Sequence, residues 1–125
     1  MIKDLYKSKV YELSNYRNSI SEVIPKDIIT KEPSAELRPN QLDTDSLPDY
    51  EVLDKILNLY IEQDSSSEKI IATGIQPDLV YDVLEKVDRN EYKRKQVAPG
   101  VKLTQKAFGK DRRMPITNTY IRQKE

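Results

Sequence analysis

A run of positive charge between residues 90 and 114 is the clearest chemical feature of the sequence. The segment NEYKRKQVAPGVKLTQKAFGKDRRM holds eight lysines and arginines against two acids, Glu91 and Asp111. A solvent-exposed helix face would mix the two signs more evenly, so this composition indicates a surface that meets negative charge. Lys93 and its neighbours could bind a phosphate group through charge-assisted hydrogen bonds. They could equally be ordinary cations at the end of a helix, where the helix dipole favours positive charge.

A long polar loop from residue 31 to residue 48 is the second candidate for a functional segment. Pro33, Pro39 and Pro48 interrupt it, and its apolar residues follow no helical or strand period. Loops longer than about a dozen residues are usually functional or disordered. Ser34 directly follows Pro33, so its hydroxyl stands on a stiff backbone and can donate to a phosphate oxygen. An ordinary turn or a helix cap would explain Ser34 equally well.

The composition excludes several classes of active site. The chain has no cysteine and no histidine, which removes disulfides, thiolate nucleophiles, Ser-His-Asp triads and histidine-bound zinc. The net charge is zero, yet ten acids lie between residues 32 and 68, while the basic run follows Arg89. This separation argues against nucleic acid as a partner and suits a local anionic ligand or an acidic neighbouring surface.

The sequence predicts a cytoplasmic protein with a small core. No apolar run approaches the ~20 residues that a membrane-spanning helix needs. The first ten residues, MIKDLYKSKV, lack the apolar core of a signal peptide. Only 37% of the 125 residues are hydrophobic, with a single phenylalanine and no tryptophan. Because this core is thin for the length, we expect a segment that packs against more protein.

Apolar spacing predicts three helices, over residues 5–18, 50–62 and 77–95. Asp4 is the expected N-cap of the first helix, and Pro77 suits the first position of the third. The apolar positions that define the three helices are Leu5, Val10, Leu13, Leu53, Ile56, Leu57, Tyr60, Leu79, Val80, Val83, Leu84 and Val87.

The sequence also predicts the structure of the segments that connect these helices. Residues 27–30 form a short apolar stretch that we expect to be extended, and residues 63–69 have the composition of a linker. A short helical turn is expected at residues 70–72, stopped by Gly74. The tail that follows Gly100 is expected to be extended. The predicted fold class of the chain taken alone is therefore mainly α.

The two candidate segments together resemble glutamine-dependent NAD(+) synthetases. The motifs are K-E-P-S-A-E-L-R-P-N-Q-x-D-x-D-S-L from residue 31, N-E-Y-K-R-K-Q from residue 90, and A-P-G-V-K-L-T with A-F-G-x-x-R-R-M-P-I in the tail. The resemblance covers residues 4–116. It implies the C-terminal portion of the synthetase (ATP-pyrophosphatase) domain, whose α/β fold is adenine-nucleotide-α-hydrolase-like, or Rossmann-like. In that portion, residues 31–48 would be the phosphate-side loop and residues 96–125 an extended basic tail.

The resemblance also implies ligand contacts for four residues. Lys7, within Y-K-S-K-V-Y-E-L, and Ser34 match positions that bind ATP. Tyr92 and Lys93 match a pair that binds deamido-NAD, although the single-domain relatives usually have histidine where this chain has Tyr92. The aromatic plane is kept there and the imidazole is lost. Without the resemblance, Lys7 would be taken as a solvent-facing lysine. No catalytic or metal-binding residue is assigned.

The implied reaction is the ATP-dependent amidation of deamido-NAD to NAD with ammonia from glutamine. The family's Ser-Gly-Gly-x-Asp-Ser loop and the acid expected as a second magnesium ligand do not occur in this sequence. The Glu-Lys-Cys set of the glutaminase domain does not occur either. ATP and magnesium are therefore expected to act with the rest of a longer enzyme, one joined to a glutaminase domain and assembled as a homo-oligomer. This chain alone is expected to be inactive.

Two other classes of function are considered. A nucleic-acid-binding module would use the basic tail, but the acidic middle of the chain and the absence of interleaved aromatic and basic residues weigh against it. A helical binding or adaptor module is the second alternative. It leaves the long loop at residues 31–48 without an explanation.

Overall fold

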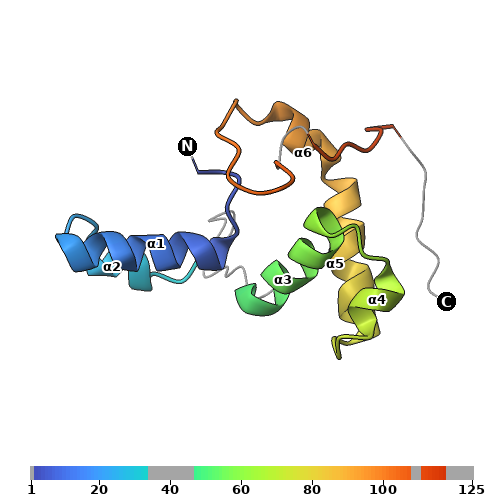
Figure 1. Cartoon of the computed structure of the whole chain (residues 1–125), viewed down its shortest axis with the longest axis horizontal. Helices are drawn as coiled ribbons and strands as arrows, with labels where there is room; N and C mark the ends of the chain where they lie inside the picture. The colour runs from blue at the N-terminus through green and yellow to red at the C-terminus, as the bar shows by residue number, and fades with distance from the viewer. Residues whose placement is uncertain (1, 34–46, 108–110, 118–125) are drawn as a thin grey trace, which may run out of the picture. The chain divides into compact units, whose positions relative to one another are not determined.

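The computed structural model describes residues 2–33, 47–107 and 111–117, and the regular structure of these residues is entirely helical (Figure 1). This agrees with the predicted mainly α class. The elements in chain order are α1 (Lys7–Ile20), α2 (Lys26–Thr30), α3 (Tyr50–Leu57), the π-helix η2 (Asn58–Glu62), α4 (Ser67–Ile71), α5 (Pro77–Arg89) and α6 (Glu91–Gln96). The chain divides into a small unit, Tyr6–Asp54, and a large unit, Met1–Leu5 with Lys55–Glu125. Each unit is described by itself.

In the small unit, α1 begins at Lys7 and its first turn is capped from another helix. The preceding residue makes no side-chain cap. Instead, Asp54 of α3 accepts hydrogen bonds from the Ser8 backbone N–H (3.0 Å) and hydroxyl (2.5 Å). A carboxylate at a helix N-terminus satisfies free N–H groups and interacts favourably with the dipole. The predicted N-cap, Asp4, was wrong because its carboxylate binds the tail of the large unit.

The turn between α1 and α2 is closed by one side chain. The Asn18 side-chain oxygen accepts from the N–H groups of Val23 (3.1 Å) and Ile24 (3.0 Å), and its amide donates to the Ile24 carbonyl (2.7 Å). The chain then enters α2 directly after Pro25. The extended segment predicted for residues 27–30 was therefore wrong, because Pro25 starts a helical turn there.

The apolar residues predicted for α1 are not buried. Leu13 is 44% exposed and Val10 is half-buried, and α1 contains no buried residue. The predicted helix is confirmed, with a slightly later start and end. Its apolar side is not covered by the described residues of the chain.

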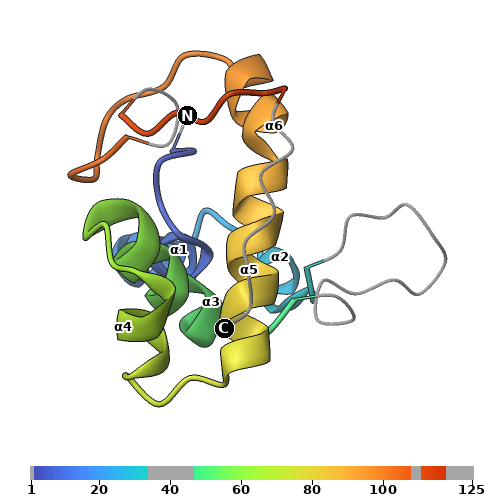
Figure 2. The same ribbon diagram turned by 90° about the vertical axis from the view of Figure 1, so that its right-hand side faces the viewer.

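The large unit has its core between η2, α4 and α5. Helix α4 packs against both η2 and α5 (Figure 2). The predicted inward residues Val80, Val83 and Leu84 are buried, whereas Leu79 and Val87 are only half-buried. The remaining buried apolar residues are Ile56, Tyr60, Ile61, Ile70 and Tyr81.

The predicted helix over residues 50–62 is confirmed, but its last turn is a π-helix. The Gln63 N–H donates to the carbonyl of Asn58, five residues earlier (3.2 Å). Two consecutive residues, Tyr60 and Ile61, are both buried there. A π turn is wider than an α turn, so it can direct adjacent side chains to one core, and such turns are often found at functional sites.

The connections around α5 differ from the prediction in two places. The predicted linker at residues 63–69 is shorter, because the Ser66 hydroxyl accepts from the Lys69 N–H (3.5 Å) and α4 starts at the next residue. The predicted helix over residues 77–95 is two helices, divided at Asn90. The Asn90 side chain donates to the Lys86 carbonyl (2.7 Å) and so caps the end of α5. Pro77 occupies the predicted first turn of α5, and Gly74 (φ 90°) follows α4 as expected. Within the described ranges, no helix is both long and apolar enough to cross a membrane.

Candidate functional site

Helix α6 presents the two residues predicted to bind deamido-NAD on its surface. Tyr92 is 44% exposed, and the Lys93 ammonium lies 6.0 Å from the centroid of its ring. That distance is at the outer limit of a cation–π contact. Lys93 has no ion pair within the described part of the chain. The structure thus places an exposed aromatic ring and an exposed ammonium group beside each other on α6.

The other face of α6 carries a buried ion pair that the sequence analysis missed. Glu91 is 2% exposed and Arg94 is 6% exposed, and the Arg94 Nη2 lies 2.5 Å from the Glu91 carboxylate. Arg94 also donates weakly to the Val87 carbonyl at 3.4 Å. The i, i+3 spacing of opposite charges was the available signal. Arg94 therefore has a structural role inside the basic run, and Lys93 is available to a ligand.

Of the two residues predicted to bind ATP, the structure describes only Lys7. Lys7 is exposed at the first position of α1, with its ammonium 5.4 Å from the Tyr11 ring centroid. Ser34 lies outside the described residues. Lys7 belongs to the small unit, whereas Tyr92 and Lys93 belong to the large unit.

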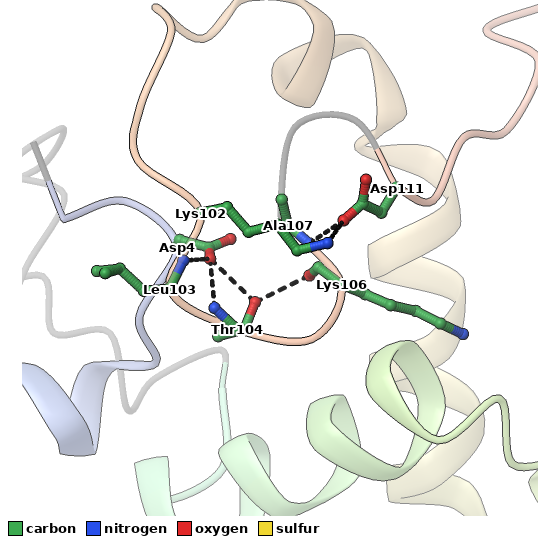
Figure 3. A network of polar contacts seen from close by, with 7 residues as sticks. All are labelled: Asp4, Lys102, Leu103, Thr104, Lys106, Ala107 and Asp111. Carbon is green, nitrogen blue, oxygen red and sulfur yellow. Dashed lines mark hydrogen bonds and ion pairs between the residues drawn. The ribbon is translucent and has the colours of Figure 1, made fainter.

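The basic tail is anchored to the start of the chain by Asp4. Its carboxylate is almost fully buried and accepts the N–H groups of Leu103 (2.6 Å) and Thr104 (2.8 Å), together with the Thr104 hydroxyl (3.0 Å) (Figure 3). Charge-assisted hydrogen bonds of this kind are roughly twice as strong as neutral ones. One acid therefore fixes the K-L-T part of the tail from 100 residues away.

A second acid, Asp111, organises the next part of the tail in the same way. It accepts the Ala107 N–H (2.8 Å) and pairs with the Lys102 ammonium (2.5 Å) (Figure 3). The Lys102 hydrogen bond, and then the Ala107 hydrogen bond, lower the pKa of this carboxyl from its ordinary 3.8. The described residues that follow α6 contain neither helix nor strand, so side-chain contacts such as those of these two acids hold the tail in place.

This arrangement predicts how the Asp111 contacts respond to pH. Because the folded pKa is lowered, the contacts are present above the unfolded pKa and are lost as the pH falls through the folded value. The backbone amide signal of Ala107 in NMR spectra should therefore titrate with a midpoint below 3.8. In Asp111→Asn this titration should be absent. A midpoint at or above 3.8 in the unsubstituted chain would contradict the Lys102 pairing.

A third contact set holds the R-R-M-P-I part of the tail. The Tyr60 hydroxyl donates to both oxygens of Asp88 (2.9 and 3.1 Å), and the Arg112 guanidinium lies 3.7 Å from the Tyr60 ring centroid. Arg112 Nη2 is also 3.7 Å from Asp88. The first arginine of the R-R pair thus packs on η2 and α5, and Arg113 stays exposed. Nothing in the spacing of a single sequence indicates this long-range contact.

A cavity of about 330 Å³ lies between α6, the tail and the first residues of the chain, all within the large unit. It is lined mainly by charged side chains. These are Lys3, Asp4, Arg94, Lys95, Lys102, Asp111 and Arg113.

Comparison with known proteins defines the class. A family model described as NAD synthase matches residues 1–97, so the chain belongs to the NAD synthase family. The glutamine-dependent NAD(+) synthetase of Aquifex aeolicus is 56% identical over 97% of this chain and 21% of its own length. That of Xylella fastidiosa (strain 9a5c) is 54% identical over 95% of this chain and 22% of its own length.

A solved structure supports the same relationship. It is the glutamine-dependent NAD+ synthetase from Acinetobacter baumannii in complex with adenosine diphosphate. It aligns with 91% of this chain and 19% of its own length, with a TM-score of 0.55 and 47% sequence identity. The chain therefore spans about a fifth of the length of the relatives it matches.

Proposed function

We propose that this chain is the C-terminal portion of the synthetase domain of a glutamine-dependent NAD(+) synthetase. The observation that carries the proposal is the 56% identity over 97% of the chain to a glutamine-dependent enzyme. The exposed Tyr92–Lys93 pair and the ordered basic tail support it, because both give a phosphate-bearing ligand a positive surface. The complete enzyme amidates deamido-NAD to NAD and consumes ATP and glutamine.

The reaction has two steps. An oxygen of the nicotinate carboxylate attacks the α-phosphorus of ATP, and pyrophosphate leaves. The nitrogen of ammonia then attacks the acyl carbon and AMP leaves, which gives the amide. Both steps depend on holding two nucleotides in place and neutralising their charge. None of the residues described here needs to act as a general base.

Each predicted site residue has a binding role in this scheme. Lys93 donates a charge-assisted hydrogen bond to deamido-NAD, and Tyr92 offers its ring plane to the same ligand. Lys7 and Ser34 donate to ATP phosphates. Magnesium would neutralise phosphate charge in the complete enzyme. In the described ranges no group of three acidic residues could hold a metal ion.

The sequence that precedes Met1 in the source genome tests the assignment. A Ser-Gly-Gly-x-Asp-Ser loop in the same reading frame, preceded by a glutaminase domain with its nucleophilic cysteine, is the expected result. An unrelated domain at that place would contradict it and would favour an adaptor module.

The 125-residue chain by itself is expected to form no NAD from ATP, deamido-NAD and either glutamine or ammonia. The reason is that its sequence contains neither the glycine loop that holds pyrophosphate nor the glutaminase nucleophile. Chromatographic measurement of NAD from a purified preparation checks this. Turnover that Ser34→Ala abolishes would show that the active site lies within these residues.

A further inference from the structure

The cavity beside the basic tail is a separate feature from the surface assigned to deamido-NAD. Tyr92 and Lys93 do not line it, whereas Arg94 and Lys95 of the same helix do. Residues one and two positions further along a helix point about 100° and 200° away from Lys93. The cavity therefore opens on a different side of α6 and calls for its own explanation.

The two acids of the cavity are already engaged by the protein. Asp4 accepts two backbone N–H groups and a hydroxyl, and Asp111 accepts the Ala107 N–H and pairs with Lys102 (Figure 3). Lys3 also has a partner, because its ammonium donates to the carbonyl of Ala98. Lys102 compensates the charge of Asp111, and the opposite charges of Asp4 and Lys3 cancel in the sum over the cavity wall.

The remaining cations of the cavity are not neutralised. Among the residues that the structure describes, Lys95 and Arg113 have neither a hydrogen bond nor an ion pair. Both are exposed and line the cavity. The uncompensated charge of the cavity wall is therefore positive, and an anion would lower its electrostatic energy.

Arg94 has a structural role in the wall of the cavity. Its side chain is 6% exposed and lines the cavity, yet its Nε–H is buried without a hydrogen-bond acceptor in the described part of the chain. Buried polar groups in native proteins are normally hydrogen-bonded, and leaving one unsatisfied is costly. The Nε atom itself has almost no accessible surface, so an anion in the cavity would not reach it, and contacts with a ligand there are left to Lys95 and Arg113.

From this geometry we infer that the cavity binds a phosphate group through Lys95 and Arg113. The volume of about 330 Å³ lies at the lower end of ligand cavities, so it suits a phosphate or diphosphate rather than a whole dinucleotide. Two free cations match a doubly charged oxyanion, and guanidinium groups such as that of Arg113 bind oxyanions in a fork geometry. The phosphate is either free in solution or part of a larger nucleotide.

Isothermal titration calorimetry of the 125-residue chain with inorganic pyrophosphate tests the site. Lys95→Ala and Arg113→Ala should each weaken binding roughly tenfold or more, because each removes one charge-assisted contact. Lys69→Ala is the matched control, since it removes an exposed lysine from the last turn of α4, away from the cavity. Equal affinities for all three variants would overturn the site. Far-UV circular dichroism verifies that each variant keeps its helices.

A variant that changes no charge tests whether binding depends on the shape of the cavity as well as on its net charge. A Cβ atom added at Gly100 would lie 2.7 Å from the Cε atom of Lys3, so Gly100→Ala must displace the Lys3 side chain within the cavity wall. We expect a weakening of several-fold for pyrophosphate. Unchanged affinity in Gly100→Ala, together with equal loss in Lys69→Ala and Lys95→Ala, would show nonspecific attraction to the basic surface.

Titration with deamido-NAD distinguishes the two sources of the phosphate. If pyrophosphate binds and Lys95→Ala weakens it, the site takes a free anion. If only deamido-NAD binds and Lys95→Ala weakens it, the phosphate belongs to the dinucleotide. No effect of Lys95→Ala or Arg113→Ala on either ligand overturns the inference. Lys93→Ala should affect deamido-NAD and leave pyrophosphate unchanged, so a failure of the proposed function is recognisable separately.

Discussion

Replacing Lys93 by alanine in the full-length synthetase should raise the apparent KM for deamido-NAD roughly ten- to a hundredfold. The substitution removes one charge-assisted hydrogen bond, worth about 1.5–3 kcal/mol, and about 1.4 kcal/mol corresponds to a tenfold change in affinity. The structure makes Lys93 suitable for this role because its side chain is exposed. The next residue, Arg94, is already in an ion pair with Glu91. Steady-state kinetics with deamido-NAD as the varied substrate provides the measurement.

The control for this prediction is Lys69→Ala, which also removes a lysine from the last turn of a helix. Both lysines interact favourably with a helix dipole, but only Lys93 is assigned a ligand contact. Glutamine hydrolysis should change little in either variant, because that chemistry is expected in another domain. If the two variants have the same KM for deamido-NAD, Lys93 interacts only with the dipole of its helix, and the assignment of Lys93 to the binding site is wrong.

The helices were predictable where apolar spacing and burial agree. Val80, Val83 and Leu84 follow the helical period and lie in the core, so the existence of α5 followed from the sequence. The division at Asn90 did not, because neither glycine nor proline marks it. It depends on the Asn90 side chain capping α5 and on Glu91 starting a new helix toward the interior.

The misassignment of Asp4 shows a second limit of local signals. An aspartate just before an amphipathic stretch has the pattern of an N-cap, and α1 does begin three residues later. The carboxylate instead binds Leu103 and Thr104, whereas Asp54 serves the first turn of α1. Both partners are far away in the sequence, so no short window could assign either acid.

For the candidate site, the sequence identified the positively charged residues. It did not show which of them are buried in structural contacts and which are exposed. Of the K-R-K run, Arg94 is buried while Lys93 and Lys95 are exposed on different sides of α6. Of the R-R pair, Arg112 packs on Tyr60 and Arg113 lines the cavity. Charge alone cannot separate these roles, because Arg112 is defined by distant partners and Arg94 by the burial of its pair with Glu91. The contacts of Lys7, Ser34, Tyr92 and Lys93 with nucleotides remain predictions.

Breaking the buried ion pair of α6 should have the largest effect on stability. Glu91→Ala leaves the Arg94 guanidinium buried without its counter-ion, and losing one partner of a buried pair costs about 3–5 kcal/mol. Folded domains are stable by only about 5–15 kcal/mol, so this single substitution should remove a large part of the stability. Urea unfolding followed by far-UV circular dichroism should show a much lower midpoint.

The neighbouring pair Glu85–Arg89 is the matched control for this effect. Its charges are 2.6 Å apart on α5, but the two side chains are 44% and 75% exposed. Surface pairs of this type contribute about 0–1 kcal/mol because solvent screens them. Glu85→Ala should therefore leave the unfolding midpoint nearly unchanged.

The double variant Glu91→Leu/Arg94→Leu separates the cost of an unpaired charge from the value of the pair. With both charges gone, apolar side chains can fill the same space, and the stability should recover well above that of Glu91→Ala. If Glu91→Ala is no worse than Glu85→Ala, then Arg94 must reach solvent or another acceptor.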